Sequence, residues 1–318
     1  MRFAWRVVMV VILMGFIASC TRGSTDAPAA LAPVALAPGE RLRVVATTTI
    51  VADIVVQVAG ELIEVRTLLP LGADPHAFEP APRDVVILED AHVVVANGAG
   101  LETFLAPFIA TAGRGVPVVE LSEGIALRDA PPGDPEHASE EGAEGDPHTW
   151  TSPANAIVFA RNAADAFATL DPDHADAYRA GAEAYVAQLE ALDAWVRGEI
   201  ETIPPESRVL VSDHDVFGYY ADRYGLAQIG AIIPAFSTMA QPSAGEFAAL
   251  QATIRERGVK AVFVGTTVNP ATADQLARDL GIRVVALYTG SLGPAGSGAD
   301  TYIDYTRYNT NAIVGALR

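Results

Sequence analysis

Two Asp-Pro-His triplets stand out among the residues of this sequence that could do chemistry. The first, within LLPLGADPHAFEP, contains Asp74 and His76, and the second, within DPHTW, contains Asp146 and His148. The proline in each triplet fixes the backbone before the histidine, which lowers the entropy cost of presenting an imidazole. Histidine is a common metal ligand, and Asp74 or Asp146 could hold its second ring nitrogen and set the tautomer. The triplets therefore predict two metal-binding imidazoles.

A third candidate ligand is His214, which directly follows the strand-like segment RVLVSD. In open α/β sheets, ligands bind beyond the carboxyl ends of the strands. Three histidines on such loops favour a metal site, with Asp215 as a further candidate for orienting an imidazole. The other histidines have structural interpretations: His92 begins an apolar strand, His174 lies in the first turn of a helix, and His137 lies in an acidic loop.

The elements that must position these residues alternate between strand and helix. RLRVVATTT, IEVRTLLP and HVVVANG read as strands, with helical segments between them, and SRVLVSD, AQIGAIIP and VKAVFVG repeat the order later. The separation along the chain between Arg43 and Arg208 equals the separation between Gly60 and Gly225. We predict an α/β fold of two similar lobes, each a mainly parallel sheet flanked by helices.

A single long spine helix is predicted between the lobes, over residues 172–203. Asp171 is a suitable N-cap, apolar residues follow at spacings of three and four, and Pro204 ends the pattern. A helix rises about 1.5 Å per residue, so this one would span roughly 48 Å and act as a stiff connection. The N-terminal lobe is then 41–171 and the C-terminal lobe 204–318.

The start of the chain reads as a leader followed by a tether. Residues 1–19 carry two arginines and then a short apolar run, the layout of a secretory signal peptide. The run ends in IASC, which resembles the lipobox of bacterial lipoproteins, with Ile17 in place of the usual leucine. The resemblance implies lipidation of Cys20, the only cysteine in the sequence. Residues 20–40, rich in alanine and proline, then form a flexible tether.

The charge of the chain excludes one class of partner. Acidic residues outnumber basic residues 39 to 21, which gives a formal net charge of −18. No basic stripe is present that could neutralise phosphates, so we expect no nucleic-acid binding. An acidic surface suits a protein that handles a cation, although it also simply keeps a protein soluble.

The sequence resembles the solute-binding lipoproteins of bacterial zinc/manganese ABC importers. The matching segments are the two Asp-Pro-His segments, NGAGLETFL, HDVFGYYADRYGL and SLGPAGSGADTYIDYTRYNTNAIVGAL, in the family's order. The resemblance implies a metal between the lobes, held by His76, His148 and His214. The family's fourth ligand is often an aspartate, and this chain has Gly290 at that position, which cannot ligate through a side chain. The acidic segment 129–146 replaces a loop that is often His-rich.

We therefore expect a monomeric, lipid-anchored protein on the outer side of the cytoplasmic membrane or in the periplasm. It would bind a divalent transition metal and deliver it to an ABC permease, without catalysing a reaction. Zn²⁺ is the expected ion because imidazoles favour it, and Mn²⁺ is the alternative. A zinc hydrolase with a three-histidine site, using Glu79 or Asp215 as a base, is a rival, although no His-Glu-x-x-His helix is present. An organic-chelate binder and an adhesin are further alternatives.

Overall fold

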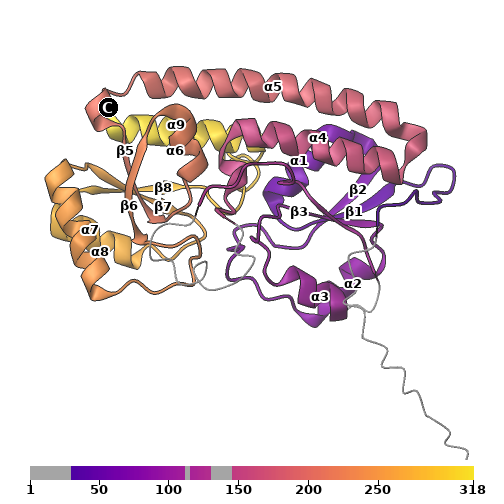
Figure 1. Cartoon of the computed structure of the whole chain (residues 1–318), viewed down its shortest axis with the longest axis horizontal. Coiled ribbons are helices and arrows are strands. Elements are labelled where there is room, and N and C mark those ends of the chain that lie inside the picture. The colour runs from indigo at the N-terminus through magenta and orange to yellow at the C-terminus, as the bar shows by residue number, and fades with distance from the viewer. Residues whose placement is uncertain (1–29, 112–114, 130–144) are drawn as a thin grey trace, which may run out of the picture.

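The computed structural model describes residues 30–111, 115–129 and 145–318. Two α/β lobes lie along one long helix, and the predicted fold class is confirmed (Figure 1). The N-terminal lobe consists of β1 (Leu42–Ala46), α1 (Thr49–Ala59), β2 (Ile63–Thr67), α2 (Pro82–Glu89), β3 (Val93–Ala96), α3 (Leu105–Thr111), β4 (Val118–Glu120) and α4 (Pro153–Leu170). The linking helix is α5 (Ala175–Glu201). The C-terminal lobe consists of β5 (Val209–His214), α6 (Gly218–Tyr224), β6 (Ala227–Ile233), α7 (Ala244–Arg257), β7 (Ala261–Gly265), α8 (Ala271–Leu280), β8 (Arg283–Leu287) and α9 (Tyr302–Leu317).

Each lobe is built on a four-stranded sheet whose paired strands are all parallel. The strand orders are β2-β1-β3-β4 and β6-β5-β7-β8, so the two sheets have the same topology. Strands β3, β5 and β7 are buried along their whole length, as expected for a parallel sheet covered on both faces. Their valine-rich sequences suit this environment because β-branched side chains pack well on a pleated surface.

The local sequence explains where several helices begin and end. Thr48 caps α1 by accepting a hydrogen bond from the backbone N–H of Val51 at 3.1 Å. Ser243 and Glu246 form a reciprocal capping box at the start of α7. Helix α7 ends at Gly258 in the left-handed conformation, which glycine adopts without a steric penalty.

Helix α5 runs along both lobes, and packs against α1 and α4 of the N-terminal lobe and against α6 and α9 of the C-terminal lobe (Figure 1). The predicted span 172–203 is divided in the structure, because a 3-10 turn occupies Pro172–His174 and the α-helix then covers Ala175–Glu201. Asp171 does not cap the backbone as predicted. Its carboxylate instead accepts hydrogen bonds from the hydroxyl of Tyr178 at 2.8 Å and from Nδ1 of His174 at 2.7 Å.

The largest hydrophobic core continues from one lobe into the other beneath α5. It includes buried residues of α1, α4 and α5 as well as residues of α6 and α9. Two smaller cores lie on the opposite faces of the sheets, one beneath α2 and α3 and one beneath α7 and α8. The lobes are therefore joined by shared packing as well as by the chain.

The tether prediction needs correction in its second half. Leu31, Val34 and Leu36 pack against the main core, and the backbone N–H of Val34 donates to the carbonyl of Leu170 at 2.7 Å. The apolar spacing in this stretch is too irregular to mark it as a packed segment. The predicted signal peptide, Cys20 and His137 lie outside the described residues, as does most of the acidic segment. Among the helices that the structure describes, none has the length and apolar character needed to cross a membrane.

Candidate metal centre

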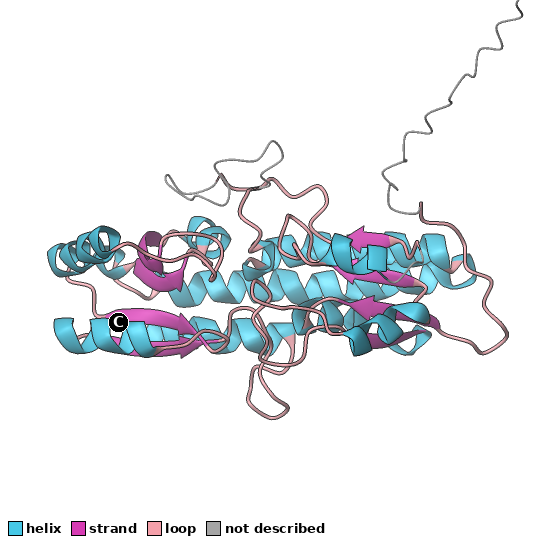
Figure 2. Cartoon of the chain, turned by 90° about the horizontal axis from the view of Figure 1, so that it is seen from below, coloured by secondary structure: helices cyan, strands magenta, loops and turns pink. Residues whose placement is uncertain are grey.

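Loops gather between the two lobes (Figure 2). The three predicted histidines, which come from loops and a strand end of both lobes, lie together in one cluster. His76 lies on the loop after β2, His148 immediately precedes a 3-10 turn at Thr149–Thr151, and His214 is the last residue of β5. One ring nitrogen of each lies within 4.8 Å of the others. His148 and His214 are buried, whereas His76 is partly exposed.

The spacing of these nitrogens fits a metal ion. Nε2 of His76 and Nε2 of His148 lie 3.1 Å apart. Zn–N bonds of about 2.0–2.1 Å in tetrahedral geometry place two ligand nitrogens roughly 3.4 Å apart. Only a small adjustment of the two rings is needed to reach that separation.

Asp146 holds His148 at two points. Its Oδ1 accepts from the backbone N–H of His148 at 3.0 Å and pairs with Nδ1 of the ring at 2.8 Å. This leaves Nε2 as the ligand atom, as expected when a carboxylate sets the tautomer of a metal-binding histidine. Burial lowers the pKa of His148, although Asp146 acts in the opposite direction. The ring is therefore kept neutral, which is the form that binds a metal.

The orienting carboxylate of His214 is Asp213, which the sequence analysis missed. Oδ1 of Asp213 accepts from the backbone N–H of His214 at 2.8 Å and pairs with its Nδ1 at 3.0 Å. Burial has the largest single effect and lowers the pKa of His214, but the charge and hydrogen bond of Asp213, together with the charges of Asp74 and Asp215, raise the pKa overall. The predicted Asp215 instead accepts a hydrogen bond from the side chain of Gln228 at 2.7 Å. The signal available in the sequence was an aspartate at the end of a buried strand, directly before the histidine.

Asp74 fixes the backbone of the first triplet and also reaches the other lobe. Its Oδ1 accepts from the backbone N–H of His76 at 3.0 Å, and its Oδ2 accepts from the hydroxyl of Thr238 at 2.6 Å. The predicted contact to the second ring nitrogen thus takes the form of a contact to the backbone. Thr238 lies between β6 and α7, so this bond joins the two lobes.

Gly290 lines the same small hollow as the three histidines, together with Pro75, Trp150 and Thr289. A Cβ atom added at Gly290 would meet Cδ of Pro75 at 2.6 Å, so the glycine allows the first triplet to approach closely. The hydroxyl of Thr289 is buried and has no hydrogen-bond partner among the described residues. Thus no side chain at position 290 supplies an oxygen, and the hollow retains one unsatisfied hydroxyl.

Trp150 forms part of the wall behind the histidines. Its ring lies edge-on to that of His148, with centroids 5.2 Å apart, and its Nε1 donates to the carbonyl of Thr289 at 3.0 Å. Glu79, considered as a catalytic base, is exposed and does not line the hollow. The wall behind the imidazoles is therefore partly aromatic, and Glu79 is not part of it.

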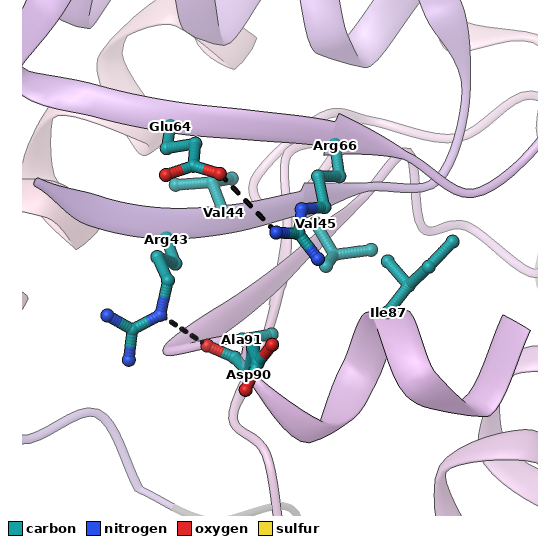
Figure 3. A pocket seen from close by; sticks show the side chains of 8 residues that line it. All are labelled: Arg43, Val44, Val45, Glu64, Arg66, Ile87, Asp90 and Ala91. Atoms are coloured by element: carbon teal, nitrogen blue, oxygen red, sulfur yellow. Dashed lines mark hydrogen bonds and ion pairs between the residues drawn. The ribbon is translucent and has the colours of Figure 1, made fainter.

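Two histidines take no part in this cluster. His174 pairs with Asp171, and His92 accepts from the backbone N–H of Arg43 at 3.1 Å. Arg43 also lines a second hollow, at the end of β1 opposite to the histidines, where its Nε donates to the carbonyl of Asp90 (Figure 3). Both histidines therefore have the structural roles that the sequence predicted.

Comparison with known proteins agrees with this geometry. A family model described as "zinc-uptake complex component A periplasmic" matches residues 44–316. The chain belongs to this family. It is accordingly a metal-binding substrate-binding protein of an ABC transporter, as the sequence resemblance implied, and a permease partner and an extracytoplasmic location follow from that role.

Individual relatives extend the match over most of the chain. The manganese-binding lipoprotein MntA of Halalkalibacterium halodurans is 34% identical over 280 residues, which cover 88% of this chain and 89% of the relative. The manganese ABC transporter substrate-binding lipoprotein PsaA of Streptococcus mitis is 29% identical over 306 residues, 94% of each chain. The solved structure of the periplasmic zinc binding protein TroA from Treponema pallidum is 28% identical, with a TM-score of 0.77, and covers 87% of this chain and 99% of that one.

Proposed function

We propose that this protein captures a divalent transition-metal ion between its lobes and delivers it to an ABC permease. The observation that carries the proposal is the convergence of His76, His148 and His214, whose ring nitrogens lie within 4.8 Å of one another. Two of these ligands follow Asp-Pro turns of the N-terminal lobe and the third ends a strand of the C-terminal lobe. An ion bound by all three would therefore be enclosed where the lobes meet.

We propose Mn²⁺ as the transported ion, because the relatives MntA and PsaA are both named for manganese. Zn²⁺ is the second candidate, and the ligand chemistry favours it. Three imidazoles with no carboxylate at Gly290 form a nitrogen-rich site, whereas Mn²⁺ prefers more oxygen ligands. Affinity also generally rises from Mn²⁺ to Zn²⁺ at such sites, so tighter zinc binding in a test tube is compatible with manganese transport.

The metal content of the protein tests this proposal. The protein would be expressed with its leader in a bacterial host, recovered from outside the cytoplasmic membrane without added metal, and analysed by mass spectrometry for bound Mn and Zn. We expect close to one metal ion per chain in the wild type and none in a variant with His76, His148 and His214 replaced by alanine. A wild-type protein that stays metal-free when offered both ions would refute the proposal.

We also propose that the protein is not an enzyme. Asp146 and Asp213 are already engaged in holding the rings of His148 and His214. Glu79 is exposed and away from the hollow. The zinc-hydrolase alternative predicts metal-dependent hydrolysis of activated esters that is lost with His148→Ala, and we expect no such activity above that of the variant.

Lipid anchoring through Cys20 is proposed from the IASC segment and from relatives that are named lipoproteins. Cys20→Ala should release the protein from the membrane fraction without changing the metal affinity of the folded body. Retention of the variant in membranes would contradict the lipid anchor. We propose that the protein acts as a monomer, which light scattering of the metal-loaded protein tests.

A further inference from the structure

Arg128 joins the two lobes beside the metal centre. Its Nη1 donates to Oδ2 of Asp146 at 3.0 Å, and its Nε donates to Oδ2 of Asp222 at 2.7 Å. Arg128 and Asp146 belong to the N-terminal lobe, whereas Asp222 lies on α6 of the C-terminal lobe. One guanidinium thus bridges two carboxylates from different lobes, an arrangement that its planar fork of donors suits. We call these three residues the Arg128 bridge.

The bridge is connected to two metal ligands. The other oxygen of Asp146 pairs with Nδ1 of His148 at 2.8 Å, so Arg128 and the imidazole share one carboxylate. Asp222 lies on the helix that follows His214 along the chain. The bridge therefore links the group that orients His148 to the element attached to His214.

Close packing around the bridge restricts its geometry. The hydroxyl of Tyr219 donates to the carbonyl of Asp146 at 2.7 Å and accepts from the backbone N–H of Arg128 at 3.2 Å. A Cβ atom at Gly218 would collide with Nη1 of Arg128. The side chain of Asp146 is fully buried, so its charge depends on the guanidinium of Arg128 and on the hydrogen bond with the ring of His148.

We propose that Arg128 is a positioning residue that couples the orientation of His148 to the contact between the lobes and thereby slows metal release. The proposal rests on the function proposed above. A bound ion and the Arg128 bridge both favour the arrangement in which His148 and His214 are close, so each stabilises the state that the other requires. Separation of the lobes would break the bridge and leave the buried Asp146 less compensated, which raises the barrier to release.

The test uses metal-loaded protein and three variants with one matched control. Arg128→Gln removes both arms of the bridge, Asp222→Asn weakens only the arm to the C-terminal lobe, and Arg128→Lys keeps the charge without the fork. The control is Arg223→Gln, because Arg223 is the neighbour of Asp222 on α6 and pairs through two nitrogens with Asp193 of α5. It removes an ion pair from the same helix without touching a metal ligand.

The measurement is the rate at which Zn²⁺ and Mn²⁺ transfer from each protein to an excess of a chromogenic chelator, followed by stopped flow. Loss of groups that hold a ligand typically costs 10–100-fold in metal affinity. We expect Arg128→Gln to release metal about tenfold faster than the wild type, near the lower end of that range. Asp222→Asn and Arg128→Lys should give smaller increases, and Arg223→Gln should change the rate no more than about twofold.

Thermal unfolding of the metal-free proteins reports general loosening, and we expect Arg128→Gln to lower the midpoint more than Arg223→Gln because it leaves the buried Asp146 less compensated. Asp222→Asn leaves Asp146 paired with Arg128, so faster release from this variant at a near-normal midpoint separates positioning from loosening. An unchanged release rate in Arg128→Gln would overturn the inference. So would an equal acceleration in Arg223→Gln. If the wild-type protein bound neither ion, the proposed function would fail first, and that result would be evident before any variant was compared.

Discussion

The two Asp-Pro-His segments share a sequence but hold their histidines differently. In both, the Oδ1 of the aspartate accepts from the backbone N–H of the histidine at 3.0 Å. Asp146 also pairs with the ring of His148, and both residues are fully buried. Asp74 and His76 are both partly exposed. The second carboxylate oxygen of Asp74 accepts a hydrogen bond from the hydroxyl of Thr238 in the other lobe.

This difference indicates that the two histidines have different roles in the proposed metal site. Asp146 fixes the backbone, ring orientation and tautomer of His148, which makes this residue the more rigid of the two. His76 lies on the more accessible side, on a loop that is tied to the C-terminal lobe by the hydroxyls of Thr238 and Ser291. In the proposed metal site, the same three-residue motif would therefore supply an anchored ligand in one place and an accessible ligand in the other.

Removal of the imidazoles should have the largest effect. His148→Ala and His76→Ala should each weaken Zn²⁺ and Mn²⁺ binding by more than about 100-fold, beyond the usual cost of losing a group that only orients a ligand. Isothermal titration or chelator competition measures this. His92→Ala and His174→Ala serve as controls and should bind as the wild type does. A near-normal affinity in His76→Ala would mean that His76 is not a ligand of the metal.

The aspartates of the two triplets provide the next test. Asp146→Asn should weaken binding by about 10–100-fold, because it removes the charge that supports the ring of His148 and leaves Arg128 half-paired. Asp74→Asn should cost less than about tenfold, since an amide oxygen can still accept from the backbone N–H of His76. Titration of both variants with the same ion measures the ratio. Equal losses would mean that the two segments hold their histidines alike.

The pH dependence of binding extends the comparison to His214, the third proposed ligand. Asp213 raises the pKa of His214 against the effect of burial, whereas burial lowers the pKa of His148 despite Asp146. As the pH falls, protons should therefore compete with the metal at His214 before they do so at His148, beginning above the ordinary histidine pKa of about 6.5. Affinity should fall steadily from pH 8 to pH 6. Asp213→Asn lowers the pKa of His214, so the ratio of the Kd at pH 6 to the Kd at pH 8 should shrink, and an unchanged ratio would contradict this assignment.

The smallest effect is expected at Gly290, where the first triplet meets the C-terminal lobe. A Cβ atom there meets Pro75 at 2.6 Å, so both Gly290→Ala and Gly290→Asp should displace the loop of His76 and weaken binding of either ion. The alanine variant is the matched control for the carboxylate. Relative to it, Gly290→Asp should shift the preference several-fold towards Mn²⁺, which favours oxygen ligands. Competition between the ions measures this, and identical preferences in the two variants would show that position 290 does not face the metal.

The parts of the fold that follow local rules could be predicted from the sequence. Buried strands of valine, helical periodicity and the position of ligands beyond strand ends sufficed to identify two parallel sheets and to bring His76, His148 and His214 to one place. The family resemblance pointed to the same three residues. These features depend on neighbours in the chain or on the general geometry of α/β sheets.

Contacts between distant segments could not be predicted in this way. The role of Asp213 depends on the direction of its side chain at the end of β5, and the Arg128 bridge joins positions that share no local pattern. The clash of a Cβ atom at Gly290 with Pro75 is equally invisible in the sequence. Leu31, Val34 and Leu36 looked like part of a tether because three irregularly spaced apolar residues do not reveal the core that they cover.

The continuous helix α5 has a mechanical consequence for unloading. The chain passes from one lobe to the other through 27 helical residues that pack on both, above a core that the lobes share. Wide separation of the lobes would therefore require α5 to bend or the shared apolar packing to be lost. A flexible hinge would open at a lower cost in free energy. If the lobes close little when an ion binds, little of the binding free energy is spent on closure. Most of it then contributes to the affinity for the ion. The free energy needed to release the ion must then come from the interaction with the permease that receives it.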